Sequence, residues 1–294
     1  MSPAENLKRL LEGEKIVVAP GVFSPSVARL AEKAGFEAAY FSGAGFSGLL
    51  GLPDLGITTL SEVARATREI TSKVKIPLLV DADTGFGEAL NVGRTAFELK
   101  AAGAAGMQIE DQVLPKRCGH LDGKELVQAD EMVKKVIAAK EEAGKELLVV
   151  ARTDARAVEG IDGAVERALL YEKAGADAIF PEALESEAEF SEFRRKVNAP
   201  LVANMTEFGK TPYMTAAQFQ GLGYNMVLFP VTAFRAAMKA VEKVFEGLKA
   251  GGTQKPMLGW LMTREEFYEL IDYYRYQEAD KKTMDAAKKV HGGS

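Results

Sequence analysis

The only cysteine of the chain, Cys118, lies in the short run Lys116-Arg117-Cys118-Gly119-His120. A thiol that only packs in a core has apolar neighbours, whereas a thiol that must pass through its thiolate form is stabilised by nearby cations. Two basic residues precede this thiol, and a histidine follows it two positions later. The run therefore predicts chemistry at Cys118.

A pair of aspartates ends one of the buried apolar runs. Asp81 and Asp83 are two positions apart, and side chains alternate along a strand, so both carboxylates lie on one face. They repel each other unless a cation or a proton intervenes. With no histidine nearby and Glu110 at the end of the next run, oxygen ligands favour Mg²⁺ or Mn²⁺ over zinc. The alternative is a turn whose aspartates cap the next helix.

Arginines at two other run ends predict a negatively charged ligand. Arg152 lies at the end of the fifth apolar run and Arg235 follows the eighth. A guanidinium donates two parallel hydrogen bonds to a carboxylate or phosphate, although any single arginine can also form an ordinary surface ion pair. No glycine-rich phosphate loop follows the last two runs, where barrels often hold phosphate. A metal with arginines therefore favours a polycarboxylate substrate.

Composition describes an ordinary globular protein. Of 294 residues, 47% are apolar and 27% charged, and the net charge of -5 gives no electrostatic footprint for nucleic acid. A single cysteine excludes an internal disulfide framework and fits a reducing cytosol. The charged start lacks the apolar core of a signal peptide, and the longest uncharged stretch, 38–53, is too short for a membrane helix. We expect a cytoplasmic protein with neither a nucleic-acid nor a membrane partner.

Apolar runs without polar alternation predict eight buried parallel strands. They cover 16–19, 38–42, 77–83, 106–111, 147–154, 177–182, 200–204 and 225–230. Amphipathic segments at 28–34, 63–72, 164–174 and 216–222 predict helices between them. Glycines at 35, 103, 175 and 223 stand where a helix ends in left-handed φ. The alternation predicts a (β/α)8 barrel over residues 1–250, with an open doubly wound sheet as the alternative, and a helical extension over 251–294.

A set of motifs in a specific order resembles the isocitrate lyase and phosphoenolpyruvate mutase superfamily, most of all its methylisocitrate-cleaving branch. The motifs are Leu52-Pro53-Asp54-Leu55-Gly56, Val80-Asp81-Ala82-Asp83, Ile109-Glu110-Asp111-Gln112, Lys116–His120, Ala151-Arg152-Thr153-Asp154-Ala155, Phe180-Pro181-Glu182-Ala183, Asn204-Met205-Thr206-Glu207-Phe208-Gly209 and Thr263-Arg264. The resemblance implies a modified (β/α)8 barrel. It also implies Mg²⁺-dependent cleavage of methylisocitrate to pyruvate and succinate in the methylcitrate cycle of propionate catabolism.

The resemblance also implies site roles, motif by motif. Asp81 and Asp83 would hold the metal, with Asp54 and Glu110 acting through water. The implied substrate-binding residues are Ser42, Gly43, Ala44, Cys118, Gly119, Arg152, Glu182, Asn204, Met205, Thr206, Arg235 and Arg264. A glycine is more usual where Ala44 stands, so we expect that residue to make its contact through the backbone.

The chemistry of the implied reaction gives Cys118 a specific role. Cleavage leaves a carbanion on the succinate half, and a thiol with an ordinary pKa near 8.5 is mostly protonated at neutral pH. We expect Cys118 to donate the proton, with Lys116, Arg117 and His120 stabilising the thiolate. Tyr40 is our candidate for taking the hydroxyl proton, with a metal-bound water as the alternative.

Two segments are candidates for a mobile lid and for contacts between subunits. Residues 112–128 are long for a strand–helix connection and contain Gly119 and Gly123, so we expect a lid that excludes water. Beyond Gly252, apolar residues from Phe267 to Tyr274 recur at helical spacing. Those helices either pack on their own barrel or, as the resemblance implies, are exchanged between the subunits of a homotetramer.

Other activities in the superfamily are the main alternatives. They are isocitrate lyase, usually a much longer chain, 2,3-dimethylmalate lyase, oxaloacetate decarboxylase and the phosphonomutases, of which carboxyphosphonoenolpyruvate mutase is the most similar. Phe180 and Leu228 would form an apolar pocket for the extra methyl group, but such a contact discriminates by only about 1–3 kcal/mol. From another class, the alternative is a non-catalytic barrel that binds metal and carboxylates.

Overall fold

The computed structural model describes residues 1–291 and divides into two compact units. The first covers Met1–Ala236, and the second begins at Ala237. Each unit is described by itself. Among the described helices, none combines the length and the apolarity needed to cross a bilayer.

Eight parallel strands form a ring in the first unit. They are β1 (Val17–Val22), β2 (Ala39–Phe41), β3 (Leu78–Asp81), β4 (Gly106–Glu110), β5 (Leu148–Thr153), β6 (Ala178–Pro181), β7 (Val202–Asn204) and β8 (Met226–Phe229). Hydrogen bonding runs in the order β6-β5-β4-β3-β2-β1-β8-β7, and a parallel bridge from Ile179 to Leu201 joins the two ends. An open doubly wound sheet would leave two free edges, so this pairing excludes it and confirms the (β/α)8 barrel.

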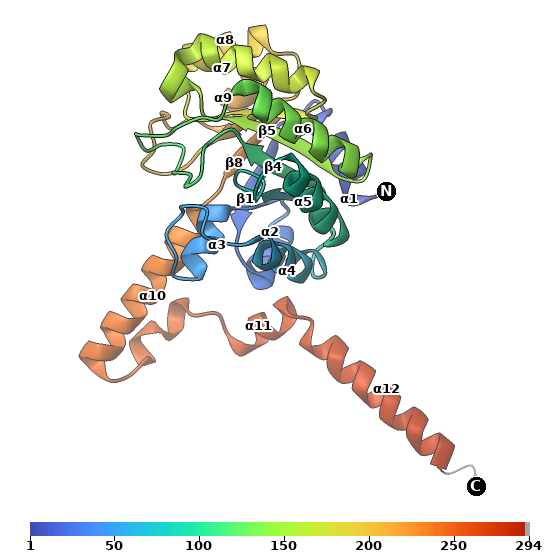
Figure 1. Cartoon of the computed structure of the whole chain (residues 1–294). Helices are drawn as coiled ribbons and strands as arrows, with labels where there is room; N and C mark the ends of the chain where they lie inside the picture. Colours follow the sequence, from blue (N-terminus) through green and yellow to red (C-terminus); the bar gives the residue numbers. More distant parts are fainter. Residues whose placement is uncertain (292–294) are drawn as a thin grey trace. The chain divides into compact units, whose positions relative to one another are not determined.

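Helices follow most of the strands, and those of the first unit cover the outside of the ring (Figure 1). In the first unit they are α1 (Pro3–Leu11), α2 (Pro25–Lys33), α3 (Gly43–Leu49), α4 (Leu60–Thr71), α5 (Ala89–Ala101), α6 (Ala129–Ala143), α7 (Arg156–Lys173), α8 (Glu187–Lys196) and α9 (Ala216–Gly221). The predicted helices are confirmed, and Gly35, Gly103, Gly175 and Gly223 all have positive φ, between 82° and 99°.

Helix α3 was not predicted from the sequence. Its glycine-rich segment has low helix propensity. The Ser42 side chain accepts a hydrogen bond from the Gly45 N–H at 3.3 Å and caps the helix start, and Phe46 is buried against Phe41. Capping and burial therefore outweigh propensity here.

The strands separate two layers of apolar packing, and this separation determines which side chains point into the ring. Tyr40 and Leu79 belong to the cluster inside the ring, whereas their neighbours Phe41 and Val80 belong to the cluster between strands and helices. Apolar residues of α1, such as Leu7, join the interior cluster together with residues from the strand starts. The end of the ring at the strand starts is therefore filled by packing.

The second unit consists of most of α10 (Thr232–Gly251), a 3-10 helix (Lys255–Trp260), α11 (Arg264–Leu270) and α12 (Tyr273–His291). Within residues 237–290, only Met257 and Leu270 are buried apolar side chains. Helices thus fill the predicted extension over 251–291, and its last three residues lie outside the described part of the chain. Its exchange between subunits stays a prediction.

Candidate active site

A cavity of about 80 Å³ lies at the carboxyl ends of the strands. Most of the residues predicted to act line it: Tyr40, Ser42, Ala44, Asp54, Asp81, Lys116, Cys118, Gly119, His120, Arg152, Phe180, Glu182, Asn204, Thr206, Leu228 and Arg235. Strand alternation explains why they meet. Asp81 lies two residues beyond the interior Leu79, and Arg152 lies two beyond the interior Val150.

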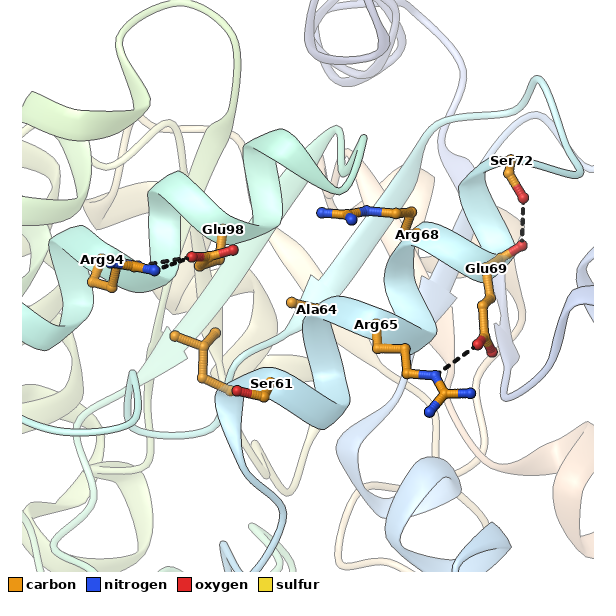
Figure 2. Close-up of a pocket in the computed structure, with 9 residues that line it drawn as sticks. Ser61, Ala64, Arg65, Arg68, Glu69, Ser72, Arg94 and Glu98 are labelled. Carbon is orange, nitrogen blue, oxygen red and sulfur yellow. Dashed lines mark hydrogen bonds and ion pairs between the residues drawn. The ribbon is translucent and has the colours of Figure 1, made fainter.

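A larger hollow, of about 640 Å³, lies on the outside of the ring between α4 and α5 (Figure 2). Four of its charged side chains pair within their own helices: the Arg65 Nε lies 2.9 Å from Glu69, and the Arg94 Nε lies 2.8 Å from Glu98. Pairs four residues apart on an exposed helix are ordinary surface stabilisation. The hollow therefore has no chemistry comparable to that of the strand ends.

The acidic pair is held rigidly by backbone and amide donors. The Asp81 carboxylate accepts hydrogen bonds from the Gly43 N–H at 3.1 Å, the Asp83 N–H at 3.1 Å and the Gln108 amide at 3.3 Å. Asp83 has a φ of 47°, and its Oδ1 lies 2.9 Å from the Lys116 ammonium, which also pairs with Asp54. Burial raises the pKa of Asp83 to about 6, and Lys116 opposes that rise.

The acidic residues present fit a hard cation. Asp83 Oδ1 and both carboxylate oxygens of Glu110 are buried and accept no well-aligned hydrogen bond, although the Lys116 ammonium lies 2.9 Å from Asp83 Oδ1 and the Arg152 guanidinium lies 3.3 Å from Glu110 Oε2. In the described part of the chain, no three His, Cys, Asp or Glu side chains converge closely enough to chelate a metal by themselves. Mg²⁺ commonly takes only one or two protein carboxylates and completes its octahedron with water and substrate oxygens. Asp81 and Asp83 suit that mode of binding.

Arg152 is the centre of the opposite half of the cavity. Its guanidinium donates two hydrogen bonds to Asp154, at 3.0 and 3.1 Å, and lies 3.3 Å from Glu110 and 3.7 Å from Glu182. The guanidinium carbon lies 5.4 Å from the centre of the Phe180 ring. Burial raises the pKa of Glu110 well above its usual range although Arg152 opposes this. Our sequence reasoning missed Asp154, whose signal was its position two residues after the arginine.

His120 is a neutral donor rather than a cation. Its Nδ1 accepts a hydrogen bond from the Lys210 N–H at 2.9 Å, so the ring proton is on Nε2, which lies 3.2 Å from Glu182 Oε1. Asn204 also donates to Glu182, at 3.0 Å. Burial lowers the pKa of His120, and Glu182 opposes that effect. The expectation that His120 supplies positive charge to a thiolate is therefore not supported by this geometry.

The other two expected cations are engaged by other groups. Lys116 is engaged by Asp54 and Asp83, and Arg117 is exposed and donates to the Asp122 carbonyl at 3.3 Å. Burial is the largest effect on Cys118 and raises the pKa of its thiol. Burial therefore favours the protonated form of the Cys118 thiol, which agrees with its expected role as an acid.

Tyr40 does not have the properties of a base. Its hydroxyl donates to Gln108 Oε1 at 2.6 Å, and burial raises the pKa of Tyr40 well above its usual range. A phenol that stays protonated cannot take a proton from a substrate hydroxyl. Instead, Tyr40 orients Gln108, which in turn donates to Asp81. We missed Gln108, although a polar residue in an otherwise apolar strand was a signal.

Three other predicted residues have distinct positions. Arg235 lies at the rim, exposed, 3.5 Å from Glu207. Met205 packs in the cluster between strands and helices, and its sulfur accepts from the Met214 N–H at 3.2 Å, so it does not line the cavity. Arg264 belongs to the second unit, and its role stays a prediction.

The predicted lid segment packs against Glu182 and Arg152. A Cβ atom added to Gly119 would come within 2.2 Å of Glu182 Oε1 and 2.6 Å of the Arg152 guanidinium. Lys124, which we had not predicted, stabilises this segment by donating hydrogen bonds to the carbonyls of Gly119 and Leu121. Ligand pockets are usually about 300–1,000 Å³, so the cavity of about 80 Å³ under this loop is small, and the opening of the loop stays a prediction.

Fold and site together define a class: (β/α)8-barrel enzymes that act on small carboxylates, with an acidic pair, a buried arginine and a thiol-bearing loop at the strand ends. Residues 7–249 match the family described as phosphoenolpyruvate phosphomutase. The chain belongs to this family, within the superfamily that includes isocitrate lyase, and the resemblance drawn from its motifs is confirmed.

Named relatives share nearly the whole chain. The 2-methylisocitrate lyase of Aeropyrum pernix is 58% identical over 288 residues, covering 98% of this chain and 93% of the relative. A crystal structure of 2,3-dimethylmalate lyase aligns with a TM-score of 0.90 at 35% identity and covers 96% of both chains. A phosphonopyruvate hydrolase solved with oxalate and Mg²⁺ aligns with a TM-score of 0.88 at 32% identity, covering 97% of this chain and all of that one.

The state of the thiol can be measured directly, because the chain has one cysteine. We expect the thiolate absorbance near 240 nm, taken as wild type minus Cys118→Ser, to rise with a midpoint above the ordinary thiol value of about 8.5. The reason is that burial disfavours the anion. A midpoint at or below pH 7 would show an activated thiolate and contradict the proton-donor assignment.

Proposed function

We propose that this chain is a Mg²⁺-dependent carbon–carbon lyase that cleaves 2-methylisocitrate to pyruvate and succinate. The observation that carries the proposal is that Cys118, on a loop packed against Arg152 and Glu182, lines one cavity together with Asp81 and Arg152. The 2-methylisocitrate lyase of Aeropyrum pernix, at 58% identity, adds support. The reaction belongs to the methylcitrate cycle of propionate catabolism, and we place the enzyme in the cytoplasm.

Asp81 and Asp83 would hold the metal, with Asp54 and Glu110 acting through water. When bound, Mg²⁺ supplies positive charge that stabilises the negative charge developing on the substrate's hydroxyl and carboxylate oxygens. The Gly43 N–H and Gln108 fix the direction of the Asp81 carboxylate, so the ligands are pre-oriented before binding.

The two halves of the substrate are bound by different parts of the cavity. Ser42, Gly43 and Ala44, where β2 meets α3, contact the pyruvate half, with Ala44 acting through its backbone. The residues that bind the succinate half are Gly119, Arg152, Glu182, Asn204, Thr206, Arg235 and Arg264. Phe180 and Leu228 are apolar and buried, and they line the space for the extra methyl group.

Cys118 completes the reaction. Cleavage leaves a carbanion next to a carboxylate on the succinate half, and Arg152 is the buried positive charge beside it. The thiol of Cys118 donates its proton to that carbon. With the loop closed, water is excluded, so the carbanion is protonated by the thiol rather than by solvent.

The second unit is proposed as an arm that binds neighbouring subunits in a homotetramer. Its helices leave large apolar side chains uncovered, among them Phe245, Trp260 and Tyr274, which are 66%, 52% and 53% exposed respectively. Apolar surface of this kind on a helix usually marks a protein–protein contact. Arg264 would then approach an active site from this arm.

We expect the chain in solution to have a mass near four times its 31.7 kDa. Replacing Phe267 and Tyr274 together by Glu should lower the mass by removing apolar contacts. Exposed Lys281→Ala in α12 serves as the control and should keep the tetramer. Light scattering after size exclusion measures both. A monomeric wild-type protein would contradict the proposal that the second unit binds neighbouring subunits.

A substrate panel tests the function itself. We expect kcat/KM for 2-methylisocitrate to exceed that for isocitrate, 2,3-dimethylmalate and oxaloacetate by at least about tenfold, because Phe180 and Leu228 favour the methyl group. Activity should disappear with EDTA and return with Mg²⁺, with Mn²⁺ as a second metal. A coupled dehydrogenase assay measures the 2-oxo acid released, which is pyruvate from the other three substrates and glyoxylate from isocitrate. No pyruvate from 2-methylisocitrate would reject the proposal.

The acid role of Cys118 is tested by Cys118→Ser. A serine hydroxyl is a far weaker acid than a thiol, so we expect kcat to fall by at least about 10³-fold, within the range that a proton-transfer group contributes. Binding of the substrate in the presence of Mg²⁺, measured by calorimetry, should change by less than about fivefold. Full turnover by this variant would remove Cys118 from the mechanism.

A further inference from the structure

Behind the arginine half of the cavity lies a second buried carboxylate, Asp111, at the start of the lid segment. It has no exposed surface. Its Oδ2 accepts hydrogen bonds from the Thr153 hydroxyl and the Tyr171 hydroxyl, both at 2.8 Å, and its Oδ1 accepts from the Asp154 N–H at 2.9 Å. The Arg167 guanidinium lies 3.4 Å from Oδ2. Asp111 does not line the catalytic cavity.

On one side, Asp111 fixes the end of β5. Its bonds to Thr153 and to the Asp154 N–H hold the residue that in turn holds Arg152 by two hydrogen bonds. The orientation of the guanidinium in the cavity is therefore determined through Asp154 by a carboxylate outside it. Such outer partners commonly set the geometry of the groups that touch a ligand.

On the other side, Asp111 fixes the base of the loop that carries the thiol. Its carbonyl accepts from the Val127 N–H at 2.9 Å, and Gln112 forms an antiparallel bridge with Leu126, so the two ends of the loop are paired. Arg167 donates to the Val127 carbonyl at 2.9 Å. Both ends of the loop thus meet at Asp111 and Arg167.

Helix α7 supplies the rest of this cluster. Arg167 is 7% exposed, and Glu159 accepts two of its hydrogen bonds at 2.7 Å, which fixes the plane of the guanidinium. Tyr171, four residues later, donates to Asp111. A buried ion pair contributes little net stability because desolvation offsets the attraction, so stability alone is a weak reason for this arrangement.

We propose that Asp111, Arg167 and Tyr171 are positioning residues, which set the loop that carries Cys118 at the correct distance from Arg152. The inference rests on the proposed function in one respect, that Cys118 delivers a proton to a carbanion beside Arg152. One carboxylate holds both partners of that step, so a shift of the loop relative to the arginine requires its contacts to break.

The test uses the lone cysteine as a reporter that needs no catalysis. Alkylation of Cys118 by iodoacetamide in the native full-length protein measures how well the loop covers the thiol. The variants are Arg167→Met, Arg167→Lys and Tyr171→Phe. Arg156→Met is the matched control, because Arg156 lies on the same helix and makes a two-point pair with Glu189, at 2.7 and 3.1 Å, that does not reach the loop.

We expect Arg167→Met to be alkylated about tenfold faster than wild type and to lose about 100-fold in kcat, the loss expected from a misplacement of about 1 Å, with KM changed less than about threefold. Tyr171→Phe should lose about tenfold in kcat, and Arg167→Lys should fall between the two. Arg156→Met should match wild type in alkylation and kcat. Thermal melting, followed by circular dichroism, monitors folding in every variant.

Other outcomes overturn the inference. A lowered Tm with wild-type alkylation and kcat would show that the cluster only stabilises the fold. A lowered kcat with unchanged alkylation would show that the loop is not what Arg167 positions. If Arg167→Met does not fold, Arg167→Lys and Tyr171→Phe decide by the same criteria. If 2-methylisocitrate is not a substrate, the proposed function fails, while the alkylation comparison still decides whether the cluster positions the loop.

Discussion

The structure depends on the burial of several carboxylates at one end of a barrel with few cations to balance them. Asp83, Glu110, Asp111 and Glu182 are all nearly or fully removed from solvent. A buried carboxylate is tolerated only if it is paired, hydrogen-bonded or protonated. Burial raises the pKa values of Asp83 and Glu110, and the nearby Lys116 and Arg152 oppose that rise only in part. The site is therefore prepared to receive positive charge, which is what binding of a divalent cation supplies.

The same constraint explains why the loop lies where it does. In its position over the strand ends, the loop places the Lys116 ammonium beside Asp83 and Asp54, where it supplies part of the missing positive charge. The same position buries Cys118 and raises the pKa of its thiol. Charge compensation and the burial of the thiol are thus two consequences of one loop position. A metal ion at the aspartates would weaken the attraction between these carboxylates and Lys116.

Local rules could predict the barrel and the cavity walls but not the direction of each side chain. Strand alternation places Asp81 and Arg152 inside the ring, so the cavity walls could be predicted. Glycines at the helix ends mark the strand–helix repeats, so the barrel could be predicted as well. The proton position on His120 depends on Lys210, 90 residues away. The part that Asp111 plays depends on Tyr171, 60 residues away. Proximity in sequence therefore suggested a cationic environment for the thiol that long-range pairing removes.

Gly119 allows the loop that carries Cys118 to approach the strand ends closely. Because it has no side chain, the loop can approach Glu182 and Arg152 more closely than any Cβ atom would allow. In the proposed reaction a close approach is what a proton donor on a loop requires, since Cys118 would have to reach a carbon held by groups on the strands. The strands would hold fixed charge, whereas proton transfer would depend on a loop that opens to admit the substrate. An acid on such a loop would link protonation to closure, so that the thiol would meet the carbanion only after solvent had been excluded.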